Sequence, residues 1–119
     1  MYDDDTTTET SYDSFEQHVH ELVGSTLIAN ACQPHNHRFA TVSEEAVPCK
    51  GGHIHNIRFR TDSYDGHYHE FCGTSGPAVS VGDGRHVHYV SGYTSSEDGH
   101  THRFRAATLI ENPIDCNCR

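Results

Sequence analysis

All twelve histidines of this chain stand in His-x-His pairs, and no other feature of the sequence constrains the fold as strongly. The pairs are His18/His20, His35/His37, His53/His55, His67/His69, His86/His88 and His100/His102. No histidine is left outside a pair. Chance does not distribute twelve residues of a 119-residue chain in this way, so the pairs mark an internal repeat.

The repeat has a period of two residues. Aligned on the histidines, its copies read HVHELVGST, HNHRFATVS, HIHNIRFRT, HYHEFCGTS, HVHYVSGYT and HTHRFRAAT. Histidine stands at offsets 0 and 2, a large apolar residue at offset 4, and Ser or Thr at offset 8. Even offsets share one face of a β-strand, whereas a helix would place the two histidines about 200° apart. Each copy therefore predicts a strand with its histidines on one face.

The predicted strands span residues 18–26, 35–43, 53–61, 67–75, 86–94 and 100–108. The links 62–66 (DSYDG) and 95–99 (SSEDG) are too short to return the chain to the start of a parallel neighbour. They predict antiparallel hairpins closed by Asp-Gly turns. The expected fold is all-β, with about six short antiparallel strands in a meander that forms a small barrel or a two-layer sandwich. A hairpin used three times is the expected higher unit.

A meander would alternate the histidine pairs between the two ends of the sheet. The first, third and fifth strands would then contribute six histidines to one end, and the other three strands six to the opposite end. We expect the histidine face to point inward, because it is more uniform than the mixed face that carries, for example, Arg58, Arg60, Tyr89 and Tyr93.

The histidine pairs predict metal binding. Neutral imidazole is the commonest side-chain ligand for transition metals, and a neighbouring strand can complete a site begun by one pair. The metal ligands predicted are all twelve histidines, His18, His20, His35, His37, His53, His55, His67, His69, His86, His88, His100 and His102, with zinc, copper or nickel as the ion. The alternative is a solvated or hydrogen-bonded polar face that serves solubility or a response to pH.

Two smaller patterns leave alternatives open. The offset-8 hydroxyl could bond a histidine ring nitrogen and fix its tautomer, or it could simply suit a strand end. Glu16, Asp65 and Asp98 stand two residues before a pair and could be metal ligands. Asp65 and Asp98 precede a Gly, which favours a role in the turn instead.

The predicted function is a structural or metal-sequestering role without catalysis, because enzymes seldom carry six equivalent copies of a site. One alternative is a self-assembling filament or coat subunit stabilised by metal and by intersubunit disulfides. The other is a metal-dependent oxygenase or hydrolase, which would need an open coordination position.

A homo-oligomer or polymer is the expected state, with disulfides through Cys116 and Cys118. The five cysteines cannot all pair within one chain.

Composition divides the chain into an acidic, Thr-rich arm (1–17), the repeat domain (18–110) and a tail with a Cys-x-Cys motif (111–119). The net charge of −9 repels the phosphates of nucleic acids and anionic membranes, so neither is expected as a partner. No apolar run is long enough to span a membrane, so no membrane insertion is expected. The N-terminal segment lacks the basic start and apolar stretch of a secretory signal, which leaves cytoplasmic and cell-surface locations open.

The repeat resembles the YmaF family of small bacterial proteins. The matching segments are HNHRFATVSEEAVP, TSGPAVSVGDGRHVHYVSGYT and DGHTHRFRAATLIENPI, the last being the most specific. The resemblance extends over roughly residues 18 to 114 and implies the histidine pairs, but it implies no activity. The acidic arm and the Cys-x-Cys tail look like additions to the family pattern.

Overall fold

The computed structural model describes residues 17–30 and 33–111. The predicted acidic arm and Cys-x-Cys tail therefore lie outside the described residues, apart from one residue of each. Cys32, Cys116 and Cys118 lie outside them as well. Within the described part of the chain, no helix is long and apolar enough to cross a membrane.

The protein is all-β, as the repeat predicts. Its strands are β1 (Glu21–Ser25), β2 (Arg38–Val42), β3 (Ala46–Cys49), β4 (Gly52–Arg60), β5 (Glu70–Thr74), β6 (Ala78–Gly82), β7 (Arg85–Tyr93) and β8 (Arg103–Ala107). All pairings between them are antiparallel. They form three sheets, of order β1-β2, β3-β4-β5 and β6-β7-β8. The described strands number eight, where about six were predicted, and they form three small sheets with no closed barrel.

The two additional strands, β3 and β6, arise in the links that the repeat left unassigned. Both are short edge strands, and β3 contains Pro48, which an edge strand tolerates because it has no ladder bond to lose on its outer side. They pair with the histidine segments of β4 and β7, placing His55 opposite Ala46 and His88 opposite Ala78. This pairing explains why β4 and β7 run for nine residues while the other repeat strands start only after their histidines.

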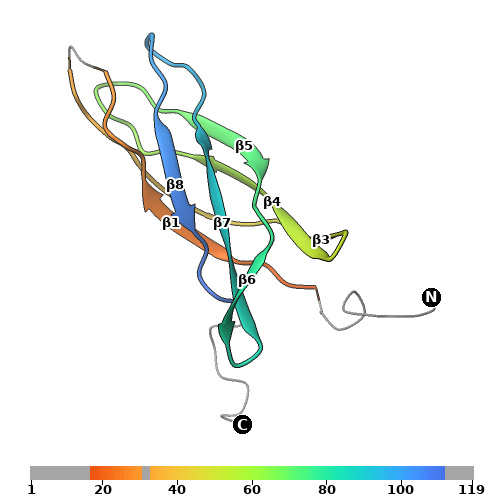
Figure 1. Ribbon diagram of the computed structural model, residues 1–119. Helices are drawn as coiled ribbons and strands as arrows, with labels where there is room; N and C mark the ends of the chain where they lie inside the picture. The colour runs from red at the N-terminus through yellow and green to blue at the C-terminus, as the bar shows by residue number, and fades with distance from the viewer. Residues whose placement is uncertain (1–16, 31–32, 112–119) are drawn as a thin grey trace.

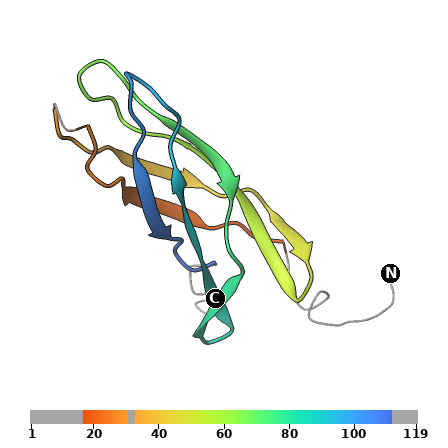
Figure 2. The ribbon, with the colours of Figure 1, turned by 45° about the horizontal axis from the view of Figure 1, so that its top comes forward.

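The predicted hairpin, used three times, is the unit of the fold. Hairpin I is β1-β2, hairpin II is β4-β5 and hairpin III is β7-β8, and the links 62–66 and 95–99 turn as predicted. The three hairpins lie side by side around a common axis, with the connections that follow β1, β4 and β7 at one end and the β3 and β6 edges toward the other (Figures 1 and 2).

Backbone hydrogen bonds link each hairpin to the next. Asp62 N–H donates to Arg38 O and Glu44 N–H to Asn56 O, joining hairpins I and II. Equivalent pairs join II to III (Ser95 to Glu70, Gly76 to Tyr89) and III to I (Leu27 to Arg103, Leu109 to Glu21). The chain thus has an approximate threefold arrangement. The ladders do not continue across these seams, which is why no closed barrel forms.

The hydrophobic core fills the middle of this arrangement and comes from the repeat. Its buried members are Leu22, Phe39, Ile57, Phe59, Val90 and Phe104, with Phe71 and Ala106 packed against them. All stand at offset 4 or 6, on the face that the histidines share. The Phe39 ring stacks on Phe59 at 4.1 Å, and Phe104 meets both rings edge-on. The core is small for a domain of this length and is bounded at both ends by histidines.

We expect Gly24→Ala to destabilise the protein by about 1–3 kcal/mol through overpacking. A Cβ at residue 24 would lie 2.8 Å from the Phe39 ring, which cannot move away because Phe59 and Phe104 hold it. The matched control is Gly52→Ala, where a Cβ would meet nothing within 4 Å. Urea unfolding of both variants measures the difference, and equal midpoints would contradict it.

Candidate metal centres

The structure gathers the histidines into two groups, one at each end of the core. Centre 1 consists of His18, His20, His53, His55, His86 and His88, whose ligand nitrogens all lie within 4.8 Å of one another. Centre 2 consists of His35, His37, His67, His69, His100 and His102. Five of these meet the same limit, and the sixth, His67, has its Nε2 3.3 Å from Nε2 of His35. The groups follow the predicted alternation: each hairpin gives one pair to each centre.

Each centre has an inner and an outer layer. The second histidine of every pair is the inner one, and all six inner rings, of His20, His37, His55, His69, His88 and His102, are fully buried. The first histidine of each pair is the outer one and is buried or partly buried. The expectation that the histidine face points inward is therefore confirmed, and a solvated histidine face is excluded.

Every inner ring is oriented by the same contact. Its Nδ1 lies 2.8–2.9 Å from a backbone carbonyl of a neighbouring hairpin. The acceptors are Leu109, Asp62, Glu44, Ser95, Gly76 and Leu27, for His20, His37, His55, His69, His88 and His102 in turn. A carbonyl can only accept, so Nδ1 carries the proton and Nε2 presents a bare lone pair to the centre. Metal-binding histidines are held in this way.

The offset-8 hydroxyls hold the backbone of the inner histidines. Thr61 Oγ1 accepts the His69 N–H at 3.0 Å, while the Thr61 N–H donates to the His69 carbonyl at 2.9 Å. The same reciprocal pair recurs in all three hairpins. Four of the hydroxyls also lie 3.3–3.4 Å from an inner Nδ1, but the carbonyl that follows each hydroxyl is the closer partner. Their main role is thus to fix the strand end that carries the ligand.

We expect Thr94→Val to destabilise the protein by about 1–3 kcal/mol, because it leaves the buried His102 N–H without an acceptor. Valine keeps the shape of threonine, so packing changes little. The control is Thr101→Val, at an exposed position in the same hairpin. Thermal melts of the two variants should differ by several degrees, and equal melting temperatures would remove this role from the hydroxyl.

The outer histidines are oriented less uniformly. His35 Nδ1 donates to Gln33 O at 2.8 Å, and the Tyr64 ring stacks on the His35 ring at 4.4 Å. His100 Nδ1 donates to Asp98 O at 3.2 Å, and His67 Nδ1 lies 3.5 Å from the Asp98 carboxylate. Asp98 thus orients the His100 ring through its backbone carbonyl and lies beside the His67 ring.

Glu111 contacts centre 1 and is a residue that the sequence did not reveal. It is 8% exposed, its Oε1 accepts the His86 N–H at 2.9 Å, and its Oε2 lies 3.2 Å from His86 Nδ1. Burial alone would raise the pKa of Glu111, but amide hydrogen bonds and the nearby histidines outweigh it and lower the pKa. The Glu111 carboxylate is therefore ionised beside centre 1. Its position outside the repeat explains why no spacing pattern points to it.

Burial favours the neutral form of eight of the imidazoles. It lowers the pKa of His55 to about 3 and of His53 and His88 to about 4, with repulsion from neighbouring rings as a further cause. In centre 2 the same causes lower the pKa of His102 to about 4. Burial also lowers the pKa values of His20, His37, His69 and His86. Neutral rings are the form that binds metal.

The acidic residues at offset −2 are turn residues where the structure describes them. Asp65 and Asp98 have φ values of 51° and 53°, and the glycines that follow also have positive φ. Two successive positive φ values define the type I′ hairpin turn that the Asp-Gly links predicted. Glu16 lies outside the described residues, so its predicted alternatives stay open.

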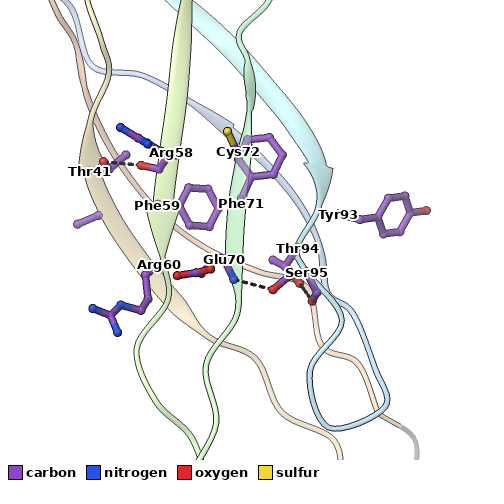
Figure 3. Close-up of a pocket in the computed structure, with 11 residues that line it drawn as sticks. Thr41, Arg58, Phe59, Arg60, Glu70, Phe71, Cys72, Tyr93, Thr94 and Ser95 are labelled. Atoms are coloured by element: carbon purple, nitrogen blue, oxygen red, sulfur yellow. Dashed lines mark hydrogen bonds between the residues drawn. The ribbon is translucent and has the colours of Figure 1, made fainter.

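A surface hollow lies over hairpin II and is lined by residues of all three hairpins. Figure 3 shows Phe59 and Phe71 at its middle, with Arg58, Arg60 and Glu70 around them and Tyr93 directed away. Two hydrogen bonds join residues that line the hollow: Thr41 Oγ1 donates to Arg58 O, and the Glu70 N–H donates to Ser95 Oγ (Figure 3). None of the histidines lines this hollow.

The fold and the two buried clusters define a class: a small all-β protein whose histidines are positioned to hold metal ions. The chain belongs to the YmaF family, whose family model, described as "Spore germination protein GerY/YamF", matches residues 15–110. This confirms the resemblance seen in the sequence. Neither a curated protein nor a solved structure matched the chain.

Proposed function

We propose that the protein binds two transition metal ions, one in each centre, and that these ions have a structural, non-catalytic role. The observation that carries the proposal is the set of bare nitrogens. Nε2 of His37, His55 and His69 are buried without a hydrogen-bond partner among the described residues. A buried polar atom left unpaired is costly, and a metal ion would pair all of them at once.

Hydrogen bonding among the histidines does not account for the clusters. His20 Nε2 lies 3.1 Å from His86 Nε2, yet the Nδ1 atoms of both rings face acceptors, Leu109 O and the Glu111 carboxylate. The same holds in centre 2 for His102 and His35. Their Nδ1 atoms face the carbonyls of Leu27 and Gln33, and their Nε2 atoms lie 3.3 Å apart. If each ring keeps its proton on Nδ1, the two Nε2 lone pairs oppose each other. A cation between them converts this repulsion into attraction.

The closed arrangement favours a structural role over catalysis. Catalytic metals keep an open coordination position, whereas structural sites are closed by protein ligands. Here six histidines surround each centre, and burial separates the inner three from solvent. The same closure argues for ions bound during folding rather than for a rapidly exchanging, metal-sequestering store. Zinc, copper and nickel all suit imidazole ligands.

Metal content of the purified protein tests this function. We expect elemental analysis and native mass spectrometry to find two ions per chain. His55→Ala in centre 1 and His69→Ala in centre 2 are a matched pair of inner ligands, and each should remove one ion. The double variant should bind none. A wild-type protein that binds no ion when refolded with zinc, copper or nickel would refute the proposal.

Self-association stays a separate proposal. It rests on Cys116 and Cys118, which lie outside the described residues, and on the polar ends of the chain. Cys49 and Cys72 are free and exposed, so they too are open to intermolecular pairing. Sizing of the protein with and without reductant tests it.

A further inference from the structure

Ring contacts place the six histidines of each centre at the corners of an octahedron. Among the described rings, each member of a centre meets every other member edge-on except one, with ring centroids 4.5–5.2 Å apart. The exceptions are three opposite pairs: His18 with His88, His20 with His53, and His55 with His86. In centre 2 they are His35 with His69, His37 with His100, and His67 with His102. Four adjacent neighbours and one opposite partner is the connectivity of an octahedron.

The origin of this geometry is the threefold arrangement of the hairpins. The three inner rings form one triangle, the three outer rings a second, and each outer ring lies opposite an inner ring from a different hairpin. Two triangles offset in this way are the opposite faces of an octahedron. The i, i+2 spacing supplies the two layers, because both histidines of a pair lie on one face of a strand.

Distances between the donor atoms fit six-coordination. In centre 1, Nε2 of His86 lies 3.1 Å from those of His18 and His20 and 3.2 Å from that of His53. An octahedron with edges of 3.1 Å places its middle about 2.2 Å from each corner, a suitable metal–nitrogen distance. Opposite corners are then about 4.4 Å apart, inside the 4.8 Å limit that all six nitrogens meet. Edges of 3.3 Å make centre 2 slightly wider.

We infer that both centres are six-coordinate octahedral sites, and that they select divalent iron, cobalt or nickel over zinc and copper(II). The inference rests on the proposed function and goes further by assigning the class of ion. Zinc has no d-electron preference and is almost always four-coordinate in structural sites, while copper(II) favours tetragonal geometry. Nickel(II), cobalt(II) and iron(II) gain ligand-field stabilisation from six nitrogen donors.

The surrounding hydrogen bonds keep the site from rearranging around a four-coordinate ion. All three inner rings of centre 1 are anchored to carbonyls of other hairpins, and the His86 ring is held by Glu111. A four-coordinate ion would leave two of the six Nε2 lone pairs unpaired. Raw affinity for divalent metals follows the Irving–Williams order. Selection for six-coordinate ions therefore comes from the rigid shell, which fixes the number of donor nitrogens at six.

Cobalt(II) alone is the probe that separates the outcomes. Tetrahedral cobalt(II) absorbs strongly in the visible range, whereas octahedral cobalt(II) absorbs weakly because its d–d transitions are forbidden at a centre of inversion. We expect two cobalt ions per chain with absorption at least about tenfold weaker per ion than that of a tetrahedral site. Two bound ions with strong absorption would overturn the inference and leave the proposed function intact. No bound cobalt, nickel or zinc would overturn both.

Single alanine variants of the six ligands of centre 1 give a second readout, with centre 2 in the same molecule as the internal reference. In an octahedral site each of the six contributes, so every variant should weaken cobalt retention at centre 1 or open a position to azide. If two of the six can be replaced without either effect, the site is four-coordinate. Competition between equal amounts of nickel and zinc should leave nickel in at least about tenfold excess in the wild type.

Discussion

Removing the metal should lower the melting temperature of the protein by tens of degrees or unfold it at 25 °C. An ion present at a thousand times its dissociation constant stabilises the folded state by about 4 kcal/mol, so two such ions contribute about 8 kcal/mol. Native domains are stable by only about 5–15 kcal/mol in total. For a domain of this size each kcal/mol corresponds to several degrees. The measurement is a thermal melt after incubation with a strong chelator, compared with the untreated protein.

The structure explains why the effect should be so large. Among the described residues, nine large side chains are fully buried, and six of them are the inner histidines rather than apolar residues. Without an ion, the bare Nε2 atoms of His37, His55 and His69 remain unpaired inside the protein. Adding metal back should restore the original melt. The double variant His55→Ala/His69→Ala should no longer respond to chelator, and an identical wild-type melt with and without chelator would refute a structural role for metal.

The sequence predicts the centres well because a strand's period of two is a rigid geometric rule. Once the pairs stand at offsets 0 and 2, their shared face follows, and the short links 62–66 and 95–99 force the alternation between two ends. The burial of Leu22, Phe39 and Phe104 beside the histidines follows from the same rule. These inferences need only local geometry and chain length.

What the sequence does not reveal depends on packing between hairpins. Strands β3 and β6 carry no histidine. β3 contains Pro48, and β6 contains Ser80 and Gly82, so in the sequence both segments resemble links. The carbonyls that orient the inner rings belong to neighbouring hairpins, and backbone acceptors leave no trace in residue identity. Coordination number likewise depends on three hairpins meeting around one axis. The sequence alone therefore indicates a metal but cannot distinguish four ligands from six.

Acid should unfold the protein in a window set by the histidines. Burial lowers the pKa of eight of the histidines from 6.5, to about 3 for His55 and to about 4 for His53, His88 and His102. Above pH 6.5 the rings are neutral in both the folded and the unfolded states, so stability is fully present. Below pH 6.5 the unfolded chain takes up protons that the folded chain excludes, and stability falls until the folded-state pKa values are reached. Stability therefore rises with pH across this window.

The size of the effect makes acid a decisive test. Each histidine that stays neutral costs about 1.4 kcal/mol for every pH unit below 6.5. At pH 5 the four histidines whose pKa is lowered to about 3 or 4 would together cost roughly 8 kcal/mol, comparable with the total stability of a typical domain. Protons also compete with metal for Nε2, in the same direction. Glu111 adds its own loss of stability only below its usual pKa of 4.5, because its pKa is lowered in the folded state.

Circular dichroism melts from pH 8 to pH 4, with and without chelator, measure how the melting temperature depends on pH. A melting temperature that is flat or rises between pH 6.5 and pH 5 would show that the histidines are not held neutral by the fold.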